Sequence, residues 1–281
     1  MKSLKKPIPY CNWFITQKIF TQSFNAMINK PGIYVFVSVG ITIMLLMLHN
    51  TIENINSGYV LILSEPFIVP LLLFSIFGSF FVSLMAGLSI AKDREEGLLE
   101  SLFYGPINTL DYVIGKSLSF SVIFIVMVII YSIVCLILAT LANFVITKYF
   151  IAIICLSIAV TTSIVGLVIL IATFMRSIRG TIFFALGVIL LLSTLQFGED
   201  ILLNIVSSSA FLSLITIRDI FVRINHGLAW ISPVAYFFSG YDAIFRNNHL
   251  LFFVYFFGSL AYGFVTNNIA AAHMQRKGIL G

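Results

Sequence analysis

Charged side chains that could do chemistry gather in one short stretch between two long apolar runs. Lys92 and Glu96 are four residues apart, as are Glu96 and Glu100, so a helix over residues 92–105 would hold them on one face. The apolar residues of this stretch would form another face: Leu98, Leu99, Leu102 and Phe103. Pro106 follows and stops such a helix. The pattern predicts a short amphipathic helix that lies on a membrane or docks in a partner's groove. An ordinary solvated loop is the alternative.

No catalytic or metal-binding set can be assembled from the remaining residues. The histidines and cysteines are scattered and form no cluster of ligands: His49, His226, His249, His273, Cys11, Cys135 and Cys155. Gly115, Lys116 and Ser117 imitate the end of a phosphate-binding loop, but the glycine required five residues before the final glycine is Leu110. We therefore expect no cofactor, metal or ATP to be bound by this chain.

The composition places the chain in a membrane. Of its 281 residues 60% are hydrophobic and only 10% are charged, with a mean hydropathy of +1.07. A soluble domain carries about 25% charged residues, so this chain could not cover a water-exposed surface. Six apolar runs approach or exceed the roughly 20 residues that a spanning helix needs. They cover residues 32–48, 67–91, 117–143, 149–175, 181–197 and 250–269.

The Lys and Arg residues predict the orientation of these six spans. An even number of spans brings both termini to one side, and twelve of the sixteen basic residues fall on that side. Basic residues collect on the cytoplasmic side, so both termini are predicted to be cytoplasmic. The net charge of +5 is thus explained by topology, without a nucleic-acid partner.

Two segments outside the spans have patterns of their own. Residues 10–30 carry aromatic and aliphatic side chains at near-helical spacing and predict an interfacial amphipathic helix, although a longer first span is the alternative. Residues 198–249 form a large outer segment whose apolar runs are too short or too interrupted to span, which favours short interfacial or re-entrant helices.

Small residues follow one face of the second predicted span. They recur every four residues as Ser75, Ser79, Ser83 and Gly87. Such a smooth stripe lets another helix approach closely, and we expect it to serve packing within the chain rather than substrate binding.

The stretch REEGLLESLFYGPINTLDYVIGKSLS, residues 94–119, resembles the signature of type 2 ABC transporter permeases, in which an acidic residue and a glycine precede a glutamate, a proline and a Gly-Lys pair. The six spans and the N-terminal helix match as well, so the resemblance covers most of the chain. The segment from Trp230 to Phe245 is similar to the one before the last span in the gliding-motility and nitrous-oxide-reductase-maturation branch.

The resemblance implies a single all-α transmembrane domain, residues 1–281, in a bacterial inner membrane. Residues 92–105 would be the coupling helix that meets a separate ATP-binding subunit, present in two copies, which binds ATP and Mg²⁺. The contact residues would be Arg94, Glu95, Glu96, Gly97, Glu100 and Pro106. A second permease subunit, identical or paralogous, would complete the pathway within membrane lipid, and an extracytoplasmic accessory protein is left open.

Two functions stay open on the sequence. The first is the permease subunit of an ATP-driven exporter of a hydrophobic or lipid-like substrate. The second is an ABC-type membrane anchor that transmits ATP-driven motion to an extracytoplasmic partner bound by residues 198–249. A proton- or ion-coupled carrier is disfavoured, because the span interiors hold no ionisable residues.

Overall fold

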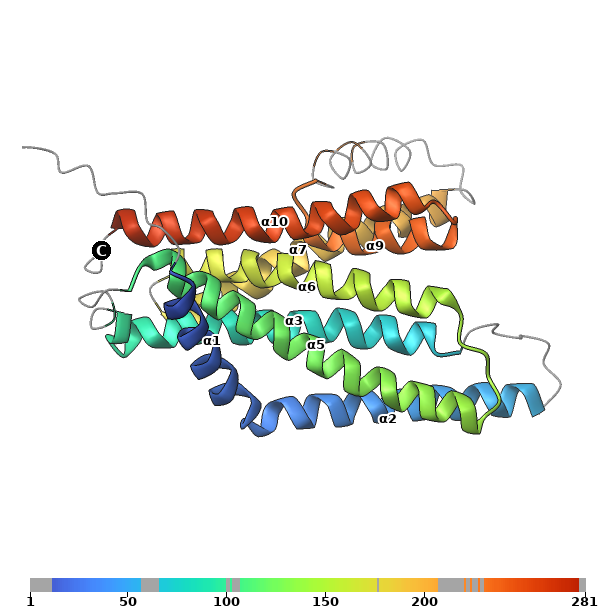
Figure 1. Cartoon of the computed structure of the whole chain (residues 1–281). Helices are drawn as coiled ribbons and strands as arrows, with labels where there is room; N and C mark the ends of the chain where they lie inside the picture. Colours follow the sequence, from blue (N-terminus) through green and yellow to red (C-terminus); the bar gives the residue numbers. More distant parts are fainter. Residues whose placement is uncertain are drawn as a thin grey trace, which may run out of the picture.

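The long helices lie side by side in one bundle (Figure 1). The computed structural model describes residues 12–56, 66–99, 102, 107–175, 177–206, 220, 223, 227 and 230–277. Five helices in this part are long and apolar enough to cross a membrane: α2 (Pro31–Asn56), α3 (Ile68–Glu95), α5 (Thr109–Leu141), α6 (Lys148–Phe174) and α10 (His249–Lys277). A sixth, α7 (Ile178–Val206), has a shorter apolar stretch from Ile178 to Thr194. The prediction of an all-α membrane protein is confirmed.

Two shorter helices complete the described fold. Helix α1 (Trp13–Ile28) crosses one end of the bundle, against α5. Helix α9 (Pro233–Phe245) packs on α6 and α10 within the predicted outer segment, much of which lies outside the described residues. We call the end of the bundle where α1 lies, and where α3, α6 and α10 finish, the α1 end. The opposite end, where α9 turns into α10, is the α9 end.

Several helices run beyond the apolar stretches that predicted them. Helix α2 continues past residue 48 to Asn56, where His49 and Glu53 form an exposed pair 3.9 Å apart. Helix α5 begins at Thr109, well before residue 117. Helical hydrogen bonds do not require apolar side chains, so a helix can extend into water or into polar surroundings after the apolar run has ended.

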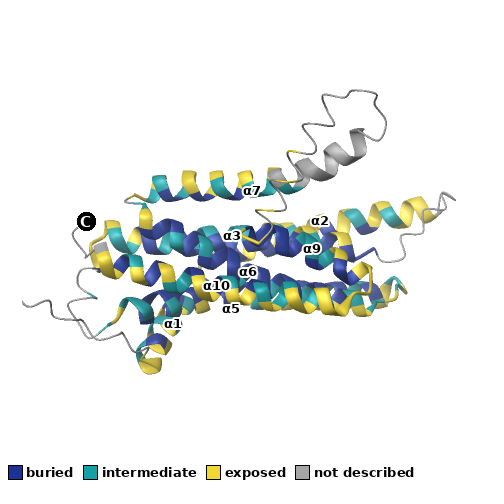
Figure 2. Cartoon of the chain, turned by 90° about the horizontal axis from the view of Figure 1, so that it is seen from above, coloured by how far each residue is buried: buried dark blue, intermediate teal, exposed yellow. Residues whose placement is uncertain are grey.

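The core is centred on α6, which packs against α3, α10, α9 and α5. Figure 2 shows buried residues along α3 and α6, whereas α7 lies at the edge of the bundle with one face exposed. The small-residue stripe of α3 faces this core, since Ser75, Ser79, Ser83 and Gly87 are all buried. A Cβ added to Gly87 would lie 2.7 Å from Cγ1 of Val168 on α6, so the stripe is where these two helices approach.

Helices α6 and α10 cross at close range. The Ser163 and Ser259 hydroxyls are 2.7 Å apart, and Ser163 Oγ also donates to the Ser259 carbonyl at 2.6 Å. Glycines stand on both helices beside this pair. A Cβ on Gly263 would lie 2.9 Å from the Thr162 carbonyl oxygen, and a Cβ on Gly166 would lie 3.0 Å from the Gly263 carbonyl oxygen. Backbone therefore meets backbone here, as in other membrane helix pairs rich in small residues.

Candidate functional site

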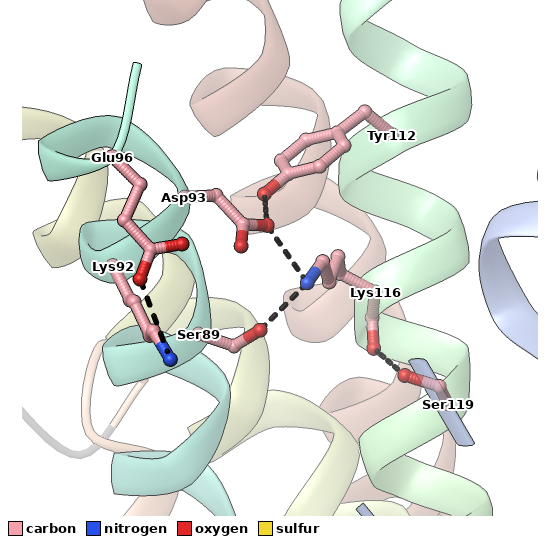
Figure 3. Close-up of polar contacts among 7 residues, drawn as sticks. All are labelled: Ser89, Lys92, Asp93, Glu96, Tyr112, Lys116 and Ser119. Atoms are coloured by element: carbon pink, nitrogen blue, oxygen red, sulfur yellow. Dashed lines mark hydrogen bonds and ion pairs between the residues drawn. The ribbon is translucent and has the colours of Figure 1, made fainter. Parts of the chain in front are cut away.

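A polar cluster joins α3 to α5 at the α1 end of the bundle (Figure 3). Lys116 on α5 places its Nζ 2.9 Å from Asp93 Oδ2 and 2.6 Å from Ser89 Oγ, both on α3. Tyr112, one turn before Lys116, donates its hydroxyl to the same Asp93 oxygen at 2.5 Å. The Lys116 and Asp93 side chains are only 11% and 18% exposed. The two charges therefore balance each other largely out of water, where losing either one is costly.

Arg94 and Glu95, the next two residues of α3, hold the turn between α6 and α7. Arg94 donates to the carbonyls of Thr173 at 3.2 Å and Met175 at 2.5 Å, at the end of α6. Glu95 accepts from the backbone N–H of Ile178 at 2.6 Å, at the start of α7. Each charge matches its helix terminus, because carbonyl ends attract cations and N–H ends attract anions. Two predicted partner contacts therefore have structural roles within this chain.

Replacing Arg94 with methionine should lower the free energy of unfolding by about 1–2 kcal/mol, because the last carbonyls of α6 lose their donor. The measurement is the thermal unfolding midpoint of the purified chain in detergent. Arg276→Met, an exposed change near the end of α10, is the matched control and should stay within about 0.5 kcal/mol of wild type. Equal midpoints for the two variants would contradict the capping role.

The predicted coupling helix does not begin at Lys92. Residues 92–95 are the last turn of α3, whose C-cap is Glu96, and Gly97 has a φ of +69°. A left-handed residue after the cap ends a helix and favours glycine, so the prediction of one helix from Lys92 is wrong in its first part. A glycine is thus required at position 97, because residues with a side chain rarely adopt this positive φ. Leu98, Leu99 and Leu102 are helical again, while the predicted contacts Glu100 and Pro106 lie outside the described residues.

Glu96 and Leu98 are both exposed on the surface. Glu96 is 48% exposed and pairs with Lys92 at 3.4 Å, across one turn. Leu98 is 44% exposed beside it. Exposed i, i+4 pairs contribute only a few tenths of a kcal/mol, so little stability depends on Glu96. Among the predicted contact residues that the structure describes, Glu96 is exposed and has only a minor structural role.

We call the cluster of Ser89, Asp93, Tyr112 and Lys116 the polar joint. Helix α1 is attached to it through Asp111, a fully buried residue in the first turn of α5. Its Oδ1 accepts from the backbone N–H of Asn12 at 2.7 Å, where α1 begins. Further along, α1 crosses α5 at Gly115, where a Cβ would lie 3.0 Å from Cβ of Ile19 and from the carbonyl oxygen of Thr16. The ends of α1, α3 and α5 therefore meet in one polar joint.

The motif that imitates a phosphate-binding loop is explained by these contacts. Gly115 admits α1, Lys116 pairs with Asp93, and Ser117 Oγ accepts from Asn267 Nδ2 of α10 at 2.9 Å. Each residue of the Gly-Lys-Ser sequence thus touches a different helix. The described residues contain no group of three or more His, Cys, Asp or Glu side chains that could hold a metal.

Sequence reasoning missed the central members of the joint, Asp93, Tyr112 and Lys116. A signal for them was present: Asp93 ends one span and Lys116 begins the next, and consecutive spans are usually neighbours. Opposite charges at the facing ends of two neighbouring spans can therefore form an ion pair. Arg94 and Glu95 were singled out, but their partners on α6 and α7 are about 80 residues away along the chain and share no pattern with them.

The apolar helices and the polar joint at one end define a multi-pass membrane protein of the all-α class. The family model of the ABC-2 type transporter matches residues 16–196, well over half of the chain. The chain belongs to this family and is a permease subunit of an ABC transporter, a membrane transport component that is not itself catalytic. A comparison with curated proteins found no match.

Proposed function

We propose that this permease is driven by a separate ATP-binding subunit that docks at the α1 end of the bundle and contacts Glu96 and Leu98. The observation that carries the proposal is the joint behind these residues. The last two turns of α3 are bonded to α5 through Asp93 and to α6 and α7 through Arg94 and Glu95. A force applied at the tip of α3 would therefore reach three other helices as one rigid body.

The distribution of basic residues supports a cytoplasmic position for this end. Lys and Arg residues of the described part cluster here: Lys18, Lys30, Lys92, Arg94, Lys116, Arg179, Arg276 and Lys277. Lys148 and Arg246 lie at the α9 end, and Arg223 belongs to the segment between α7 and α9. The positive-inside rule favours the side with more basic residues as the cytoplasmic one, where ATP is available.

The proposed cycle needs a second permease copy, identical or paralogous, and two ATP-binding subunits. Closure of the ATP-binding subunits would tilt the joined ends of α3, α5, α6 and α7, and would open and close a cleft between the two permeases. The exposed faces of the spanning helices are apolar, which favours a hydrophobic or lipid-like substrate and export from a bacterial inner membrane. The assignment to the gliding-motility and nitrous-oxide-reductase-maturation branch is part of this hypothesis.

Glu96→Lys tests the docking surface. We expect it to reduce co-purification with the ATP-binding subunit, and the transport that depends on it, by at least tenfold. The proposal pairs Glu96 with basic groups of that subunit, and like charges brought together at an interface cost well over 1 kcal/mol. Glu53→Lys, the same charge reversal at another exposed glutamate, at the α9 end, is the control and should leave assembly unchanged. Glu95→Lys would be a poorer test, since it also removes the contact with Ile178.

Wild-type co-purification and transport of Glu96→Lys would overturn the docking surface. The unfolding midpoint of the variant in detergent should be measured alongside. An unchanged midpoint together with lost assembly assigns the effect to the interface rather than to the fold.

A further inference from the structure

A cavity of about 400 Å³ lies at the α1 end, between α1 and the ends of α3 and α5. Its size falls within the range of small-molecule sites, about 300–1,000 Å³. One part of its wall is apolar, with Ile19 and Met27 from α1 and Leu102 from the segment after α3. The rest of the wall carries the charged side chains of the joint. Such a mixed wall suits a ligand that is itself both polar and apolar.

The charges around the cavity leave one positive charge unbalanced. Lys30, Lys92 and Lys116 face Asp93 and Glu96. Lys116 is held by Asp93 at 2.9 Å, and Lys92 pairs with Glu96 at 3.4 Å while 61% exposed. Lys30 makes no ion pair with any residue that the structure describes. Lys30 and the exposed Lys92 are therefore the two ammonium groups available to an anion.

The depth of the cavity in the membrane follows from α1. Trp13 and Phe14 on this helix are 68% and 75% exposed, while its polar residues Thr16 and Ser23 are buried against the bundle. Exposed aromatic side chains of this kind lie among lipid headgroups. Helix α1 lies roughly across the spanning helices. Because α1 is at the level of the headgroups, the cavity that it lines is at that level too.

We propose that this cavity binds the phosphodiester headgroup of one anionic phospholipid. The single negative charge of the phosphate matches the one unbalanced lysine, Lys30 and Lys92 hold its oxygens, and the glycerol and ester groups lie against the apolar wall. The lipid thereby joins α1 to the end of α3. This inference requires only that the chain is embedded in a membrane, so it stands whether or not an ATP-binding subunit docks at Glu96.

The test is native mass spectrometry of the full chain in detergent, titrated with phosphatidylglycerol. We expect one molecule to be retained, with phosphatidylethanolamine of the same acyl chains bound more weakly. Lys30→Gln should weaken the binding of phosphatidylglycerol about fivefold, which corresponds to the roughly 1 kcal/mol that one surface lysine contributes toward anionic lipid. Lys148→Gln, at the α9 end, is the control and should bind as wild type does.

Three results would overturn the proposal. These are equal binding of the two lipids, equal loss in the two lysine variants, and displacement of the lipid by millimolar glycerol phosphate. The last result would assign the cavity to a soluble phosphate compound instead. The Lys30→Gln variant should keep its fold, because the side chain is exposed and pairs with no described residue.

Discussion

Replacing Lys116 with methionine should cost about 3 kcal/mol of folding free energy and should weaken the connection between α3 and α5. The substitution keeps most of the apolar stem of Lys116 but removes the ammonium group that balances Asp93 at 2.9 Å. Breaking a buried pair costs about 3–5 kcal/mol. The lower end applies because both side chains keep some contact with solvent. The measurement is the unfolding midpoint in detergent, followed by ATP-dependent transport in the assembled complex.

Two further variants separate charge from packing. Lys92→Met removes an exposed lysine from the same region and should change the stability by no more than about 0.5 kcal/mol. The double variant Asp93→Asn with Lys116→Met removes both charges, and should recover a large share of the loss because no uncompensated charge is left. If the double variant is no more stable than Lys116→Met alone, the ion pair is not the source of the effect.

Replacing Gly263 with alanine should destabilise the bundle by about 1–3 kcal/mol, the usual cost of adding a methyl group where no space exists. The new Cβ would lie 2.9 Å from the Thr162 carbonyl oxygen and 3.2 Å from the Ser163 nitrogen. These are backbone atoms of α6, so α10 must move as a whole. That movement would lengthen the contacts between Ser163 and Ser259.

Gly258→Ala provides a control on the same helix. Its Cβ would meet only the edge of the Tyr236 ring, at 3.4 Å, which is ordinary contact with a side chain. Alanine favours a helix over glycine by about 1 kcal/mol, so this variant should be neutral or slightly more stable. The two substitutions are chemically identical, and effects of opposite sign in thermal unfolding would assign the loss to the α6–α10 crossing. Equal effects would show that the crossing tolerates a wider separation.

The comparison of Gly97 with Gly115 shows how far sequence reasoning could go at the site. Both belong to the stretch that resembles the family signature, but one ends α3 with a positive φ and the other admits α1. A pattern in the sequence identifies such glycines without separating their roles. The two roles are distinguished by the φ angle of each glycine and by the atoms nearest to it, which are set by how neighbouring helices cross.

Hydropathy and the distribution of charge were sufficient to predict a helical membrane protein and its long apolar helices. These features depend on one chain segment at a time, because a spanning helix satisfies its own backbone hydrogen bonds and needs only an apolar exterior. The pairing of Lys116 with Asp93, the contacts of Arg94 and Glu95 with α6 and α7, and the α6–α10 crossing required the folded structure. Each brings together segments that are distant in the chain, and the helix packing that joins them leaves no regular spacing in the sequence to read.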